Sequence, residues 1–235
     1  MSFWNQLKYV YLVRERLLES LGISLLVALI ACAIGFFIGV IIAMIKIAPK
    51  NNIVMKFLDK LADVYVVVIR GTPMLVQLLI MYGVILASFK TMETNLLVPI
   101  LSFGINSGAY MSEIIRSGIN SVDGGQMEAG RSLGMSWIRT MFCVVIPQAI
   151  KVVIPAIFNE IIILVKETSI ISYIVVRVNG QQKWDLLGIA EKLGLAKPAC
   201  YMTLIFTVAI LYLIIVLLLT VIQKLIEKRF KRNER

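Results

Sequence analysis

Two carboxylates lie inside an apolar stretch of this sequence, at Glu160 and Glu167. They are seven residues apart, so on a helix they share one face and lie about 10 Å from each other. Ionisable side chains inside a membrane span usually face a cavity or the bundle interior and mark a pathway. Such a pair suits a cationic solute, for example the ammonium and basic side chain of an amino acid. The alternatives are an ion pair of Glu167 with Lys166 or Arg116, and a Glu160 that contacts only headgroup water.

Polar side chains also interrupt the apolar stretch from about residue 96 to residue 115, at Asn106, Ser107 and Tyr110. Their amide and hydroxyl groups suit an α-carboxylate, although such groups equally serve helix packing in membranes. Together with the two acids they give the candidate substrate contacts: Asn106, Ser107, Tyr110, Glu160 and Glu167.

A third feature is Arg70, which lies in another long apolar stretch and is followed by Gly71 and Pro73. A charge inside a span costs several kcal/mol unless it reaches water or a partner. Glycine and proline weaken the helix, and the backbone groups they free need a cavity or neighbouring protein. These three residues are candidates for a kink that gates a path. The alternative is that Arg70 only reaches the cytoplasmic boundary beside a kink.

The most polar interruption is the loop 121–150, which reads SVDGGQMEAGRSLGMSWIRTMFCVVIPQAI. We expect residues 128–133 to form a short surface helix, entered through Asp123 and ended near Gly134, because glycine permits sharp turns at both ends. A small face on this helix allows a partner to approach, and an acid and a base three residues apart can pair with each other or across an interface. The predicted docking residues are Glu128, Ala129, Gly130, Arg131 and Gly134. The alternative is a solvated loop.

Composition places these features in a membrane protein. The 235 residues are 59% hydrophobic and only 16% charged, whereas charged residues make up roughly 25% of soluble domains. The net charge of +10 is concentrated near residues 46–60 and 224–235, which indicates topology under the positive-inside rule and not nucleic-acid binding. Three scattered cysteines and the absence of histidine give no disulfide framework or metal site. The sequence has no phosphate-binding loop and no protease or esterase motif, so we expect no enzyme activity and no cofactor.

The predicted fold class is all-α: a polytopic membrane protein with about five transmembrane helices, near 23–45, 61–89, 96–115, 152–176 and 201–225. Residues 1–20 are expected to form an N-terminal surface segment and 21–228 the transmembrane domain, with its polar loop at 117–150. Residues 229–235 form a basic cytoplasmic tail. With the basic clusters inside, an odd number of spans places the N-terminus outside and the C-terminus in the cytoplasm. Trp4, Leu7 and Tyr11 recur at helical spacing and lie along the membrane surface or form a solvated lead-in.

Four motifs in order give the whole chain a family resemblance. They are residues 70–77 (RGTPMLVQ), 106–110 (NSGAY), the loop pattern Glu128-Ala129-Gly130 with Gly134 and Pro147, and residues 159–169 (NEIIILVKETS). In these motifs the chain resembles the polar amino acid permease group of ATP-binding-cassette importers. It departs from the family pattern at Gly130, where a second alanine is usual, and at Val144, where isoleucine is common.

The resemblance implies partners and a place in the cell. The short helix of the loop would couple the chain to separate ATPase subunits, and an extracytoplasmic binding protein would deliver a small-molecule amino acid. A second copy or a paralogue would complete the path, since the chain has no internal repeat. The setting would be the lipid of the bacterial inner membrane. Two intramembrane acids favour lysine, arginine or histidine-like substrates, although the family also serves neutral and sulfur-containing ones. The alternative function is an ion-coupled carrier or channel that acts without an ATPase.

Overall fold

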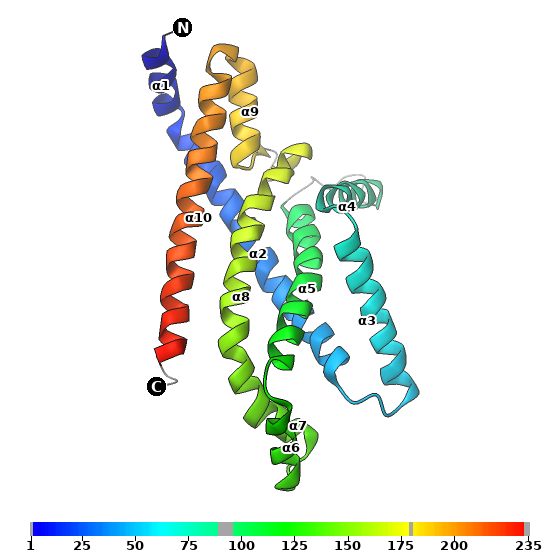
Figure 1. The fold of residues 1–235 in the computed structure, drawn as a ribbon. Coiled ribbons are helices and arrows are strands. Elements are labelled where there is room, and N and C mark those ends of the chain that lie inside the picture. The colour runs from blue at the N-terminus through cyan, green and yellow to red at the C-terminus, as the bar shows by residue number, and fades with distance from the viewer. Residues whose placement is uncertain (1, 89–95, 179–180, 233–235) are drawn as a thin grey trace. The chain divides into compact units, whose positions relative to one another are not determined.

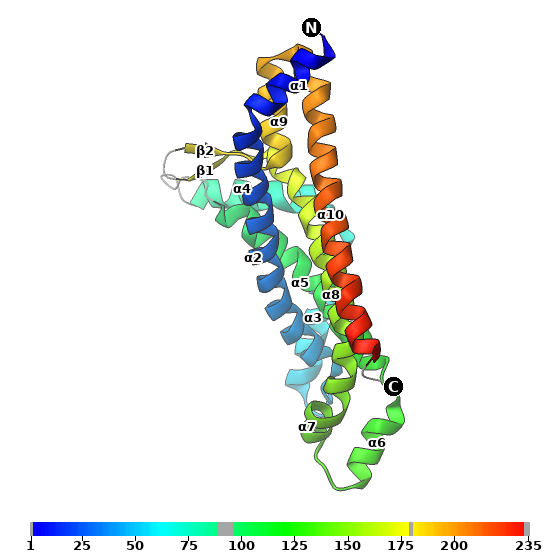
Figure 2. The same cartoon turned by 90° about the vertical axis from the view of Figure 1, so that its left-hand side faces the viewer.

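The computed structural model describes residues 2–88, 96–178 and 181–232, and it confirms the predicted all-α class (Figure 1). The elements in chain order are α1 Phe3–Leu12, α2 Arg14–Ile47, α3 Ile53–Gly71, α4 Met74–Ser88, α5 Leu97–Asn120, α6 Gly124–Ser132, α7 Trp137–Thr140, the π-helical turn η1 Met141–Val145, α8 Ile146–Glu167, the 3₁₀ helix η2 Thr168–Tyr173, strands β1 Val176–Val178 and β2 Gln181–Lys183, α9 Leu186–Ala196, the 3₁₀ turn η3 Pro198–Cys200 and α10 Tyr201–Arg232. The two strands form one antiparallel hairpin, which Figure 2 shows.

Three helical runs of the described residues are long and apolar enough to cross a membrane: Arg14–Ile47, Trp137–Tyr173 and Pro198–Phe230. Helices α3 and α4 make a fourth span if they are taken together across their break. Helix α5 corresponds to the remaining predicted span, but its buried Ser102, Asn106, Ser107 and Ser112 make it too polar to be counted on composition alone. The count of five therefore stays a prediction. Phe89, the predicted end of the second span, and the end of the predicted tail at 233–235 lie outside the described residues.

The break between α3 and α4 falls where the sequence predicts a kink. Helix α3 ends at Gly71 because Thr72, which precedes Pro73, has the extended backbone (φ −118°, ψ 145°) that a following proline imposes. The hydroxyl of Thr72 donates to the carbonyl of Val68 at 2.9 Å and so satisfies part of the open helix end.

The chain divides into two compact units, and four long helices contribute to both. The first unit comprises residues 1–32, 73–104 and 161–219. Its core joins the start of α2 to α9 and to the first half of α10, which lies beside α9 in Figure 1. The buried residues of this core are Val13, Leu17, Leu186, Ile189, Ala190, Leu193, Cys200, Leu204 and Val208.

The second unit comprises residues 33–72, 105–160 and 220–235, and it contains most of the predicted site residues. Its core joins α2, α5 and the helical run from η1 into α8 through Ala43, Ile115, Ile119, Met141, Val145, Ala149 and Val153. Gly35 and Gly39 bring α2 close to α5, because an added Cβ would lie 2.8 Å from the Cβ of Ser107 and 2.5 Å from that of Met111. Small residues four apart allow this approach between membrane helices.

Candidate coupling and transport sites

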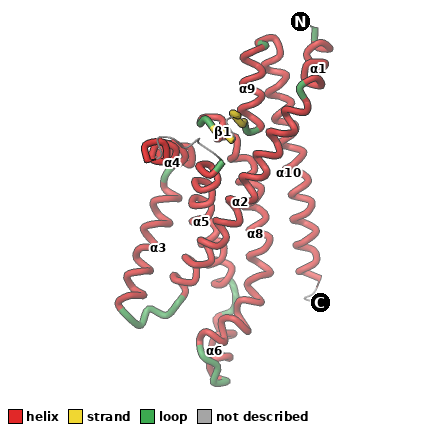
Figure 3. The backbone as a smooth tube through the Cα atoms, turned by 180° about the vertical axis from the view of Figure 1, so that it is seen from behind, coloured by secondary structure: helices red, strands yellow, loops and turns green. Residues whose placement is uncertain are grey.

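The short helix predicted in the polar loop is present as α6, and it begins four residues earlier than the predicted start at Glu128. Asp123 provides its N-cap, since the carboxylate accepts a hydrogen bond from the Gly125 N–H at 2.9 Å. Figure 3 shows α6 between two short loops, one leading from α5 and one leading to α7.

Helix α6 ends in a Schellman motif at Gly134. The N–H of Met135 donates to the carbonyl of Gly130 at 3.1 Å, and the N–H of Gly134 donates to the carbonyl of Arg131 at 3.0 Å. Gly134 has a φ of +81°, which an L-residue with a Cβ rarely adopts. The left-handed backbone that ends α6 thus explains why a glycine occupies position 134.

One face of α6 packs against the following helix. Gly130 is buried, and a Cβ at this position would lie 2.4 Å from Cγ2 of Thr140, which is fully buried. The Thr140 hydroxyl donates to the Ser136 carbonyl at 3.0 Å, so the threonine is held in place. Thr140 therefore fills the space that the methyl group of an alanine at position 130, usual in the family pattern, would need. Met127, one turn earlier, packs on the core of the second unit.

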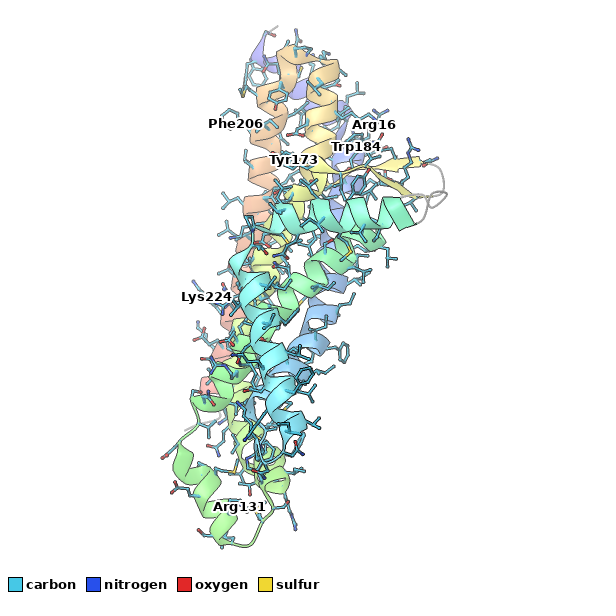
Figure 4. The ribbon with its side chains drawn as sticks, turned by 90° about the vertical axis from the view of Figure 1, so that its right-hand side faces the viewer. Arg16, Arg131, Tyr173, Trp184, Phe206 and Lys224 are labelled. Carbon is cyan, nitrogen blue, oxygen red and sulfur yellow. The ribbon has the colours of Figure 1, made fainter. Side chains whose placement is uncertain are left out.

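The opposite face of α6 is open. Glu128, Ala129 and Arg131 are exposed, and Arg131, labelled in Figure 4, donates to the Met135 carbonyl at 2.9 Å. The most exposed large apolar side chains of this loop are Leu133, at 83%, and Ile138, at 64%. Exposed apolar groups rimmed by charges are typical of protein interaction surfaces. The sequence interpretation missed Leu133 and Ile138 as surface residues because hydrophobicity alone does not say which side a residue faces.

The loop is connected to α8 by a π-helical turn, Met141–Val145, which lies just before Pro147. Proline removes one backbone donor, and in an α-helix its ring clashes with the carbonyl four residues earlier, here that of Cys143. A wider turn relieves that clash, and π turns are frequent at functional sites. The helical run from Trp137 to Tyr173 therefore leads from the polar loop into a segment that is long and apolar enough to cross a membrane.

Four of the five candidate transport residues belong to the second unit, and two of these four are in direct contact. The hydroxyl of Ser107 on α5 donates to Oε1 of Glu160 on α8 at 2.9 Å. Both residues are buried, with Ser107 at 0% and Glu160 at 5% exposure, and Asn106 beside them is buried too. The hydrogen bond from Ser107 fixes the direction of the Glu160 carboxylate. The sequence predicted both residues but not their contact.

Arg70 and Tyr110 form a second contact, between α3 and α5. The guanidinium carbon of Arg70 lies 5.2 Å from the centroid of the Tyr110 ring, within the range of a cation–π interaction. Glu113 lies one turn further along α5, within electrostatic reach of Arg70. Sequence reasoning missed Glu113, although the positions 106, 110 and 113 recur at the helical spacing that places them on one face.

The remaining candidate, Glu167, is the last residue of α8 and is half-buried. The seven-residue spacing from Glu160 runs along one continuous helix, as predicted. Arg116, one of the two partners considered for Glu167, instead forms two hydrogen bonds with Glu113, at 3.2 Å from Nε and 2.7 Å from Nη2.

A further acid, Asp185, lies outside the membrane-spanning helices, at the start of α9. Burial raises the pKa of Asp185 to about 7, although the backbone N–H groups of Leu187 and Gly188 donate to its carboxylate. Among the described residues no group of three His, Cys, Asp or Glu side chains could hold a metal ion.

The long apolar helices, the polar loop that contains α6 and the buried polar pair are typical of a multi-pass membrane transport protein. Comparison with known proteins identifies its family: residues 35–232 match the binding-protein-dependent transport system inner membrane component, and the chain belongs to this family. It is the inner-membrane permease component of an importer whose ATPase is a separate subunit, which confirms the resemblance read from the four motifs.

Relatives match almost the whole chain. The arginine transport system permease protein ArtQ of Bacillus subtilis (strain 168) is 33% identical, covering 93% of this chain and 94% of the relative. A putative glutamine transport system permease protein, GlnP of Rickettsia bellii (strain RML369-C), is 37% identical, covering 91% and 92%. A solved amino acid ABC transporter, crystallised with histidines, is 35% identical with a TM-score of 0.83, covering 97% of this chain and 99% of that one.

Proposed function

We propose that this chain forms the membrane path of an ATP-driven importer for a polar amino acid, with a preference for cationic ones. The observation that carries the proposal is the buried carboxylate of Glu160, held by Ser107 inside the membrane domain. A charged group in a span is retained where it serves a path, and an ammonium group is its natural partner. One relative is named as an arginine transport permease and another as a putative glutamine transport permease, and both names support an amino acid substrate.

Coupling is proposed to pass through the exposed face of α6. ATP-driven closure of two ATPase subunits would move the α6 helices of two permease chains, either two copies or a pair of paralogues, and switch the path between outward-facing and inward-facing states. An external binding protein would deliver substrate to the outer mouth. Nucleotide and substrate must each bind the two states with different affinity, because otherwise neither shifts the equilibrium.

The docking part of this mechanism is tested by co-purification with the ATPase. Glu128→Lys reverses a charge on the exposed face, and Leu133→Ala removes the most exposed large apolar side chain of the loop. Each variant is expected to lose most of the co-purifying ATPase, because interface anchors of this kind cost about 1 to 2 kcal/mol or more when truncated. Gln126→Ala, also exposed but not among the predicted docking residues, serves as the control. Docking that is unchanged in both variants would contradict the assignment of α6.

The substrate part is tested by ATP-dependent uptake of a labelled amino acid panel. Proteoliposomes would contain this chain, its ATPase and its binding protein, with Glu160→Gln and Ser107→Ala run beside the unchanged protein. We expect uptake of cationic amino acids to collapse in Glu160→Gln and to fall less in Ser107→Ala, since the carboxylate remains there. Equal uptake by all three proteins would leave selection with the external binding protein. A properly assembled complex that shows no ATP-dependent uptake would contradict the proposed importer function.

A further inference from the structure

Arg70 and Tyr110 face each other on open surface of the second unit. Tyr110 is 37% exposed, Arg70 is exposed, and the guanidinium lies over the ring at 5.2 Å. Both residues belong to helices that form the membrane domain, where an exposed cation needs a water-filled path or a partner. The partner that the described residues provide for the Arg70 cation is the aromatic face of Tyr110.

The neighbouring positions of α5 are also suited to a cation. Asn106, Tyr110 and Glu113 lie on one helical face, at spacings of four and three residues. Glu113 is close enough to Arg70 to act on it electrostatically. Ser107, three residues before Tyr110, holds the carboxylate of Glu160. Glu113 is already paired with Arg116 at 2.7 Å, so the group on this face that offers a site to a further cation is the Tyr110 ring.

A cation–π contact is strong enough to hold a guanidinium and weak enough to be exchanged. Its strength corresponds to about a 2- to 30-fold preference in binding. Arginine is the side chain that best fits an aromatic face, because its guanidinium is planar and weakly hydrated. The guanidinium of Arg70, which lies over the Tyr110 ring in this structure, is the same chemical group that the side chain of free arginine carries.

We propose that Arg70 is an internal competitor for a cation site on the Tyr110 ring, and that substrates with a cationic side chain enter by displacing it. The inference rests on the proposed function and names the substrate class of the path: amino acids with a guanidinium or ammonium side chain. An amino acid with a neutral side chain can offer only its α-ammonium group to the ring, whereas a basic one has a second cation on its side chain, so the pair favours basic amino acids. Arg70 and Tyr110 are thus specificity-determining residues.

The test measures binding to the complex of this chain with its ATPase, without the external binding protein, so that only the permease selects. Labelled arginine and labelled glutamine would be titrated against the unchanged complex, Arg70→Met and Arg70→Lys. Arg70→Met is expected to tighten arginine binding by about 2- to 30-fold, because the competitor is gone, and to leave glutamine binding unchanged. Arg70→Lys keeps a competing cation and should stay close to the unchanged complex. Weaker or unaltered arginine binding in Arg70→Met overturns the proposal.

If Arg70→Met does not assemble with the ATPase, a second pair of variants tests the proposed cation site on the Tyr110 ring. Tyr110→Phe keeps the aromatic face and should keep the preference for arginine over glutamine, whereas Tyr110→Leu should reduce it by about 2- to 30-fold. Equal loss of both ligands in Tyr110→Leu would show a structural role only and overturn the inference. Import of amino acids by a complex that binds neither ligand would also overturn it while leaving the proposed function intact. Absence of both import and binding would overturn both.

Discussion

At the scale of single residues, Gly130 shows how the chain adapts its coupling loop. The family pattern has a second alanine there, but Thr140 fills the space that a methyl group would need. We expect Gly130→Ala to destabilise the protein by about 1 to 3 kcal/mol, the usual cost of overpacking a filled site. The measurement is the temperature at which half of the purified protein aggregates in detergent.

The same contact predicts a rescue. Thr140→Ser removes Cγ2, the atom that lies 2.4 Å from the added Cβ, and keeps the hydroxyl that donates to Ser136. The double variant Gly130→Ala with Thr140→Ser should recover most of the lost stability. Ala129→Ser, on the exposed face of the same helix, should change little. A double variant no more stable than Gly130→Ala would mean that the two residues do not pack as described.

Residues also show where sequence reasoning stops. Spacing places Asn106, Tyr110 and Glu113 on one face of α5, but it does not say which helix faces them. The contacts of Ser107 with Glu160 and of Arg70 with Tyr110 join positions 53 and 40 apart in the chain, and they depend on how α3, α5 and α8 pack. A single sequence carries periodicity along an element and very little about pairing between elements.

At the scale of elements, local sequence signals predicted helix ends and breaks better than they predicted contacts between helices. The glycines of the polar loop and the acid at Asp123 indicated a short helix, and α6 has that acid as its N-cap and Gly134 after its last turn. Gly71 and Pro73 indicated the break between α3 and α4. By contrast, the β1–β2 hairpin and α9 were not predicted within the outer loop. The core that holds α9 includes the start of α2, which is far away in the sequence, as well as the neighbouring α10, so periodicity within the loop does not predict it.

The end of α6 gives a prediction about coupling. Gly134→Ala forces an L-residue to a φ of +81° and should cost about 1 to 2 kcal/mol at the Schellman motif. We expect the variant to lose ATPase co-purification in part, because the exposed face of α6 is no longer fixed. Gly134→Asn is the matched control, since asparagine adopts this conformation more readily and should retain more of the partner. If both variants retain the same amount of ATPase, docking does not depend on the geometry of the α6 helix end, and the prediction is wrong.

Helix α9 gives a prediction about pH. The folded-state pKa of Asp185 is raised by burial from its ordinary 3.8 to about 7, so the folded protein holds a proton that the unfolded chain has released between these values. The contribution of this group to stability is therefore fully present below pH 3.8 and is lost as the pH rises toward 7. The slope is at most about 1.4 kcal/mol per pH unit.

Asparagine at this position provides the comparison. Asp185→Asn keeps a side chain that can cap α9 but has no proton to release. Detergent aggregation temperatures measured from pH 4 to pH 8 should show the variant gaining relative to the unchanged protein as the pH rises. Parallel curves would show that Asp185 titrates at its ordinary value. Glu19, Lys183, Glu191 and Lys192, the charged groups nearest in the chain or on packed elements, are present in both proteins and cancel in the difference.

At the scale of the whole molecule, the family and the helical class follow from composition and motif order, because both are properties of the entire chain. The division into two units was not predicted, since it cuts through α2, α5, α8 and α10 and leaves no linker in the sequence. The orientation in the membrane is a further property of the whole chain. The positive-inside rule predicts that the polar loop containing α6 lies in the cytoplasm and the N-terminus outside.

The native cysteines allow this orientation to be measured directly. Cys143, in the π-helical turn beside the coupling loop, is exposed, whereas Cys32 and Cys200 are buried. A membrane-impermeant maleimide should therefore label the protein in inside-out vesicles and leave it unlabelled in right-side-out cells. Cys143→Ser should abolish this labelling, and adding Ser2→Cys to that variant should restore labelling from the outside only. Labelling of Cys143 from the outside would reverse the topology and would place α6 where no cytoplasmic ATPase can reach it, so this measurement tests the coupling assignment as well as the orientation.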